Sequence, residues 1–151
     1  MSPTKPRHGR LEYRFARVLG NFVDEHALGE VHVGEVGVYT RRDPDTVRGA
    51  DVLFISHERL SQTTLDDFFD VAPELIVEIL SPTDRRGEVE KKLREYFAIG
   101  VAAVLIVDPD KRTVSVYTSA AEFRELTVDD MLTVPEALRG FSTPIADLMD
   151  Q

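Results

Sequence analysis

Residues 73–96, PELIVEILSPTDRRGEVEKKLREY, join an apolar strand to an amphipathic helix. The strand contains Glu78 inside a run of aliphatic side chains, where an ionised group is costly to bury unless another group pairs with it. The SPTD that follows is typical of a helix start, with Ser81 or Thr83 as the expected cap. Helical spacing then predicts a buried face made of Val89, Leu93, Tyr96 and Phe97.

The pattern on either side of this stretch predicts further alternation of helices and strands. We expect a helix over about residues 10–26, because apolar side chains recur there at helical spacing. Gly34 and Gly37 indicate a bulge or bend in the first strand, and Asp43-Pro44-Asp45 indicates a turn. The expected elements that follow are strands within 31–38, 50–56 and 74–80, a helix from 81 to about 100, strands over 101–109, 113–118 and 122–128, and a short terminal helix over 144–149. The order α-β-β-β-α-β-β-β predicts an α/β fold with a mixed β-sheet flanked by helices.

Length and composition favour a single domain, residues 1–151. A chain of 151 residues with 42% hydrophobic content is large enough to bury a substantial core. It contains no cysteine, which excludes disulfides and thiolate zinc sites and is typical of a reducing cytoplasm. The longest apolar run, residues 97–107, is too short to span a bilayer. We therefore expect a cytoplasmic protein that does not bind a membrane.

The charge distribution limits the class of partner. A formal net charge of -9 argues against a protein that coats nucleic acid with a uniformly basic surface. Basic residues nevertheless gather within 1–10 and 84–95, while the region after Ser119 supplies much of the acidic excess. This distribution is compatible with a local site for an anionic partner.

Asp51 and Glu78 are the candidate metal ligands. Asp51 opens one predicted strand and Glu78 lies in the next, so their carboxylates converge if the two strands are neighbours. Crowded carboxylates repel each other and their pKa values rise, a penalty that a divalent cation removes. Because Mg²⁺ binds one or two carboxylates together with waters and phosphate oxygens, the pair predicts a Mg²⁺ or Mn²⁺ site. The backbone carbonyl of Ile79 is a further candidate ligand.

Lys92 is the candidate catalytic cation. It lies three residues after Val89 and four before Tyr96, beside the buried face of its helix, whereas Lys91 lies farther round. An ammonium at this point can orient an attacking water or stabilise charge on a phosphate. The Tyr96 ring is expected in the core with its hydroxyl at the rim. His8 and Arg85 are candidate substrate contacts, although a mobile terminal histidine and a solvated arginine are the alternatives.

Four segments in this order, ADVLFIS, APELIVEILSPTDR, KKLREYFAIGV and VLIVDPDKRTVSVY, resemble the Uma family of restriction-endonuclease-like proteins, in the PD-(D/E)xK nuclease superfamily. The resemblance covers nearly the whole chain and implies a restriction-endonuclease-like fold. It also implies that Asp51 and Glu78 are the acidic pair of the active site. The superfamily lysine usually stands two residues after the second acid, where this sequence has Leu80, and the resemblance implies that Lys92 on the next helix replaces it.

Two positions depart from the family pattern. Ala50 stands where the family usually has a proline before the aspartate. Family members also generally carry an acidic residue ahead of the segment that corresponds to SPTKPRHG, residues 2–9. If that acid belongs to the metal site, Glu12 or another group must take its place here.

Together, the residues and the resemblance predict a Mg²⁺- or Mn²⁺-dependent endonuclease that hydrolyses phosphodiester bonds in DNA. The alternative is a catalytically degenerate nuclease-like domain that serves as a nucleic-acid or protein interaction module, which the acidic composition favours. A small domain with one site cuts one strand, and cleavage of both strands needs two subunits related by a twofold axis. We therefore expect a homodimer.

Overall fold

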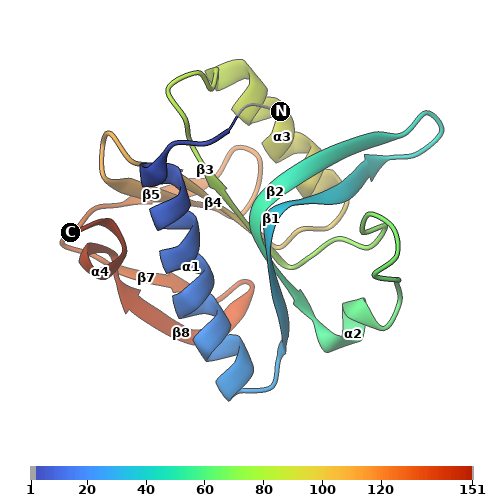
Figure 1. The fold of residues 1–151 in the computed structure, drawn as a ribbon, viewed down its shortest axis with the longest axis horizontal. Helices are drawn as coiled ribbons and strands as arrows, with labels where there is room; N and C mark the ends of the chain where they lie inside the picture. Colours follow the sequence, from blue (N-terminus) through green and yellow to red (C-terminus); the bar gives the residue numbers. More distant parts are fainter. Residues whose placement is uncertain (1–2, 151) are drawn as a thin grey trace.

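A six-stranded mixed sheet organises the computed structural model, which describes residues 3–150. The strands lie in the order β1-β2-β3-β4-β5-β6, and within this sheet only the β3–β4 pair is parallel. The elements are α1 (Pro6–Glu25), β1 (Gly29–Arg41), β2 (Thr46–Ser56), α2 (His57–Leu60), β3 (Leu75–Ile79), α3 (Arg86–Ala98), β4 (Ala103–Asp108), β5 (Thr113–Tyr117), β6 (Phe123–Leu126), β7 (Met131–Val134), β8 (Leu138–Pro144) and α4 (Ile145–Met149). The predicted α/β class, a mixed sheet with flanking helices, is confirmed (Figure 1).

The two long helices cover opposite faces of the sheet. α1 crosses the near face in Figure 1 and buries Leu11, Phe15, Leu19 and Val23, which recur at helical spacing. α3 packs on the other face, where Tyr96 and Leu93 join a separate apolar cluster. Because both faces are covered, every residue of β3 is buried, which explains why an aliphatic run is needed there.

The β1–β2 hairpin is long and extends beyond the rest of the sheet (Figure 1). Its pairing shifts register between Val33 and Val36, so one extra residue of β1 is accommodated opposite Asp51. Gly34 and Glu35 lie in this bulge, with φ of 93° and 59°. The bulge predicted at Gly34 is therefore present, and it lies beside the predicted acidic pair.

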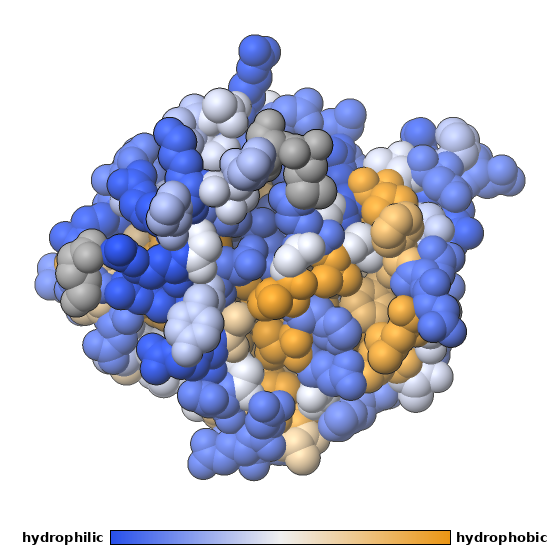
Figure 2. Space-filling model, viewed as in Figure 1, coloured by the Kyte–Doolittle hydropathy of each residue, from blue (hydrophilic) through white to orange (hydrophobic). Residues whose placement is uncertain are grey.

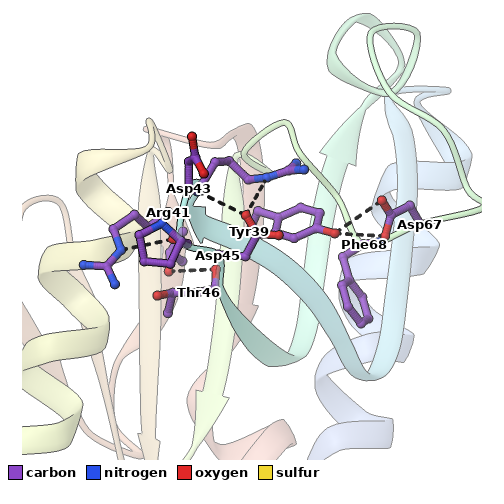
Figure 3. Close-up of polar contacts among 10 residues, drawn as sticks. Tyr39, Arg41, Asp43, Asp45, Thr46, Asp67 and Phe68 are labelled. Atoms are coloured by element: carbon purple, nitrogen blue, oxygen red, sulfur yellow. Dashed lines mark hydrogen bonds and ion pairs between the residues drawn. The ribbon is translucent and has the colours of Figure 1, made fainter.

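The segment between α2 and β3 packs against the outer edge of β1. Phe69 donates its backbone N–H to Gly37 and accepts the N–H of Tyr39, both at 2.9 Å. The Tyr39 hydroxyl donates to Asp67 at 3.1 Å, and the neighbouring Phe68 ring lies 5.7 Å from the Tyr39 ring (Figure 3). These contacts cover the middle of an otherwise open sheet edge.

The second predicted helix begins later than expected. Residues 81–84 form a turn in which the Asp84 carboxylate accepts the Ser81 N–H at 2.7 Å, and the Ser81 and Thr83 hydroxyls lie 3.1 Å from each other. α3 starts only at Arg86, with Arg85 as the capping position and no side-chain cap. The predicted caps Ser81 and Thr83 were therefore wrong, because their side chains stabilise the preceding turn instead.

The pattern did not predict β7 and β8, which form a separate two-stranded sheet. Leu132 and Val134 of β7 are fully buried in the cluster that also contains α1. This small sheet therefore extends the α1 face of the core rather than the six-stranded sheet.

Figure 2 shows the α1 side of the molecule, with mostly hydrophilic side chains and an apolar region toward the β1–β2 hairpin. Within residues 3–150, none of the helices is long and apolar enough to cross a membrane.

Candidate active site

Asp51 and Glu78 lie on neighbouring antiparallel strands, β2 and β3. Strand pairing ends at Val52 and Val77, and beyond this point the Ile79 N–H donates to the Asp51 carboxylate at 2.8 Å. The Asp51 side chain thus takes the place of the next backbone acceptor. Both acids are buried, with 6% of Asp51 and 8% of Glu78 exposed. The sheet therefore brings the two predicted acids into one buried region.

Helix α3 supplies two groups that contact the Glu78 carboxylate. The Tyr96 hydroxyl donates to Oε1 at 2.9 Å, and the Lys92 Nζ lies 3.6 Å from Oε2. Lys91, by contrast, is exposed, and no hydrogen bond or ion pair among the described residues joins it to Glu78. The structure thus places Lys92 at the acidic pair. Tyr96 is fully buried, so the expectation that its hydroxyl lies at the rim was wrong: the hydroxyl has an internal acceptor in Glu78.

Burial dominates the electrostatics of Glu78. Removal from water raises its pKa from an ordinary value of 4.5 to about 7; Lys92 and the Tyr96 hydrogen bond oppose this rise, whereas the negative charge of Asp51 adds to it. Burial therefore favours the protonated form of Glu78 well above the pH at which a solvent-exposed glutamate ionises. Burial and the Glu78 charge raise the pKa of Tyr96 far above its usual range, so its hydroxyl remains a donor.

The first turns of α1 approach the site from the other face of the sheet. The His8 Nε2 lies 3.4 Å from the Asp51 carboxylate, which places this predicted substrate contact at the acidic pair. Glu12 lies one helical turn farther along. Partial burial raises the pKa of Glu12, and the charges of Asp51 and Glu35 add to the rise while His8 opposes it. Glu12 is thus within electrostatic reach of Asp51.

A small cavity of about 30 Å³ adjoins Glu78, Lys92 and Tyr96. Asp84 and Glu88 also line it, together with apolar side chains of β3, α3 and β4. A volume of this size has room for a water molecule between polar partners. The cavity therefore has room for one water beside the Lys92 ammonium and the Glu78 carboxylate.

The donor set fits a small divalent cation with a partly hydrated shell. No group of three or more His, Cys, Asp or Glu side chains within residues 3–150 is arranged to hold a metal ion. Two carboxylates and the Ile79 carbonyl are instead the kind of oxygen set that Mg²⁺ or Mn²⁺ completes with water and phosphate oxygens. The raised pKa of Glu78 also indicates a place where added positive charge is favourable. Glu12 does not complete a three-ligand group.

Arg85 is the one predicted site residue that the fold leaves at a distance from these contacts. It occupies the capping position of α3 and is exposed, and among the described residues no hydrogen bond or ion pair joins it to Asp51 or Glu78. Conversely, the contact of Tyr96 with Glu78 was not predicted from the residue pattern. The spacing of Lys92 and Tyr96, one helical turn apart, was the available signal, because it predicts that both side chains face the same strand.

The mixed sheet with its covering helices has a counterpart among solved structures. A solved structure from Anabaena variabilis, described as "a putative nuclease belonging to DUF820", matches with a TM-score of 0.82 and 21% identity, covering 98% of this chain and 83% of that chain. At this identity, the likeness establishes the fold alone.

Residues 1–146 match the model of the Uma2 family, described as "Putative restriction endonuclease". The chain belongs to this family, and the resemblance seen in its sequence segments is confirmed. No curated protein matches the chain.

Proposed function

We propose that this protein is a Mg²⁺- or Mn²⁺-dependent endonuclease that hydrolyses phosphodiester bonds in DNA. The observation that carries the proposal is the position of Glu78, buried in β3 beside β2, which bears Asp51, and 3.6 Å from the Lys92 ammonium. Burying an acidic pair with an adjacent cation costs desolvation free energy that a purely structural arrangement would not need to incur. Membership of a restriction-endonuclease family supports the same chemistry.

Each residue has a distinct role in this proposal. Asp51, Glu78 and the Ile79 carbonyl would hold the cation, which when bound supplies positive charge to the phosphate and makes water more acidic. The Lys92 ammonium donates to the attacking water or to a phosphate oxygen. His8, 3.4 Å from Asp51, would contact the substrate phosphate, and Arg85 would contact the DNA backbone farther out.

Cleavage of supercoiled plasmid in the presence of Mg²⁺, Mn²⁺ or EDTA tests the activity directly. The wild-type protein should nick the plasmid with either metal and lose this activity in EDTA. Asp51→Asn and Glu78→Gln each keep the shape and remove one negative charge, so both should be inactive. Cleavage that persists in EDTA, or in Glu78→Gln, would contradict the proposal.

Melting temperature against Mn²⁺ concentration tests the metal site without relying on catalysis. A ligand that binds only the folded state stabilises it in proportion to the logarithm of its concentration above Kd. Wild type should therefore gain stability with Mn²⁺, whereas Asp51→Asn and Glu78→Gln should not. If the melting temperatures of all three proteins rise equally, or none rises, the alternative of a catalytically degenerate interaction module is favoured over the metal-dependent nuclease.

We also propose that the protein acts as a homodimer, because two sites related by a twofold axis would allow cleavage of both strands. β6 is the outer strand on one side of the six-stranded sheet, and its Phe123 side chain is 55% exposed. This edge is the proposed contact.

A further inference from the structure

The Glu78 carboxylate is held at both oxygens by a single helix. Tyr96 contacts Oε1 and Lys92 approaches Oε2, and the two residues lie one turn apart on α3. The two contacts differ in kind. The Tyr96 contact of 2.9 Å is a hydrogen bond of ordinary length, whereas 3.6 Å at Lys92 is an ion-pair separation beyond the usual hydrogen-bond range. The hydroxyl is thus the tighter constraint on the carboxylate.

Packing fixes the position of that hydroxyl. The Tyr96 side chain is 0% exposed and belongs to the buried cluster that contains Leu53, Ile76 and Val104. Lys92, whose side chain is 32% exposed, has rotamers open to solvent. Since the ring cannot move without displacing the core, the hydroxyl presents its proton at one point in space. Glu78 must orient its carboxylate to meet it.

A phenylalanine at position 96 would fill the same space without a buried polar group. A buried hydroxyl is unfavourable unless it is hydrogen-bonded, and its partner here is the carboxylate that the proposed function makes a metal ligand. Groups that hydrogen-bond metal ligands set ligand orientation, and their loss commonly weakens metal binding by about 10- to 100-fold. The hydrogen bond from Tyr96 to Glu78 would therefore affect metal binding at Glu78 as well as satisfying two buried polar groups.

We infer that Tyr96 is a positioning residue: its hydroxyl holds the Glu78 carboxylate in the orientation in which that carboxylate binds a divalent cation. The inference rests on the proposed metal site and deepens it. Tyr96 itself contacts neither the cation nor the substrate. It acts through Glu78, so its removal should weaken metal binding while leaving the fold in place.

Tyr96→Phe is the direct test, with Tyr13→Phe as the matched control because Tyr13 is 63% exposed. Mn²⁺ binding is measured from the electron paramagnetic resonance signal of free Mn²⁺, which needs no substrate. Tyr96→Phe should raise the Kd for Mn²⁺ by about 10- to 100-fold, and Tyr13→Phe should leave it unchanged. Melting in EDTA should show that both variants remain folded.

The outcomes separate this inference from the proposed function. If wild type binds Mn²⁺ and Tyr96→Phe binds it equally well, Tyr96 has no positioning role but the metal site stands. If wild type binds no Mn²⁺, the proposed function fails and this inference fails with it.

Two further measurements distinguish positioning from a general loss of packing. Glu78→Asp withdraws the carboxylate by one methylene, so adding Tyr96→Phe to it should cause little further loss; a full additional loss would overturn the inference. Replacing tyrosine with 3-fluorotyrosine adds one fluorine to each of the four rings and makes the Tyr96 hydroxyl a stronger donor. It should shift the Glu78 carboxyl ¹³C resonance, assigned by its absence in Glu78→Gln, and an unchanged resonance would also overturn the inference.

Discussion

Glu78 places an ionisable group in a strand whose other residues are aliphatic. Its carboxylate has a hydroxyl and an ammonium for partners, yet burial and Asp51 still raise its pKa to about 7. The partners therefore only partly offset the loss of hydration. A cation bound between the two acids would offset the remainder.

This residue should impose a measurable pH dependence on stability. The pKa of Glu78 is raised from 4.5 to about 7 in the folded state, so the fold favours the protonated form. The protonated Glu78 side chain stabilises the fold fully at pH values below its pKa in the unfolded chain. This stabilisation is lost as the pH rises through the pKa of Glu78 in the folded protein, and its upper limit is about 3 kcal/mol. Glu78→Gln lacks this titration. In EDTA, the melting temperature of Glu78→Gln relative to wild type should increase between about pH 5 and about pH 8.

Glu90→Gln is the control for that measurement, because the Glu90 side chain is 51% exposed and pairs with Arg86 on the surface of α3. Its stability difference from wild type should vary little over the same pH range. Parallel curves for wild type and Glu78→Gln would show that Glu78 does not titrate in this range.

Lys92 and Lys91 form a second matched pair at the scale of single residues. Lys92→Ala should abolish plasmid cleavage while leaving the protein folded; because it removes the ammonium beside the buried Glu78 carboxylate, it should lower the free energy of unfolding by about 1–3 kcal/mol. Lys91→Ala should retain wild-type cleavage, because Lys91 is exposed away from Glu78. The reverse result, with Lys91 essential and Lys92 dispensable, would show that the assignment of the catalytic ammonium to Lys92 is wrong.

At the scale of elements, an ion pair joins the β1–β2 hairpin to α3. Arg48 of β2 binds both carboxylate oxygens of Glu95, at 3.0 and 2.6 Å, and the Thr40 hydroxyl of β1 donates to the same carboxylate at 2.7 Å. These bonds lower the pKa of Glu95, with the Arg48 hydrogen bond as the main cause. Because Glu95 precedes Tyr96 on α3, the pair also helps hold the helix that carries Lys92 and Tyr96.

Arg48→Met keeps most of the aliphatic stem but removes both hydrogen bonds to Glu95. Loss of a charge-assisted pair of this kind, with both side chains mostly buried, should lower the free energy of unfolding by about 1–3 kcal/mol in chemical denaturation. Arg86→Met is the control, since the Arg86 side chain is 94% exposed in its pair with Glu90, and exposed pairs contribute about 0–1 kcal/mol. Equal effects of the two substitutions would mean that the hairpin does not depend on Arg48.

At the scale of the whole molecule, the proposed dimer has a specific edge to test. Phe123 projects from β6 and stacks on Tyr117, with ring centroids 4.7 Å apart. Light scattering at tens of micromolar should give twice the mass of one chain, and Phe123→Lys should shift the protein toward the monomer by placing a charge at the proposed contact. Leu65→Lys is the control, because Leu65 is 64% exposed but lies outside β6. A monomeric mass for wild type would contradict the dimer.

The amino-acid pattern was enough to predict the class of fold and most of its elements, because hydrophobic periodicity is a local property of the chain. Aliphatic runs predicted the buried strands β3 and β4, and helical spacing distinguished Lys92 from Lys91. Consecutive strands that carry Asp51 and Glu78 were sufficient to suggest that the two acids meet. Helix caps were less predictable, because Ser81 and Thr83 can stabilise a turn as readily as a helix start.

The surroundings of the acidic pair, by contrast, depend on how the elements pack together. The contact of His8 with Asp51 joins residues far apart in the chain, and depends on how α1 packs across the sheet. The hydrogen bond of Tyr96 to Glu78 depends in the same way on the docking of α3. The raised pKa of Glu78 follows from desolvation by all the elements around it. No local pattern encodes this quantity, because burial is a property of the assembled core.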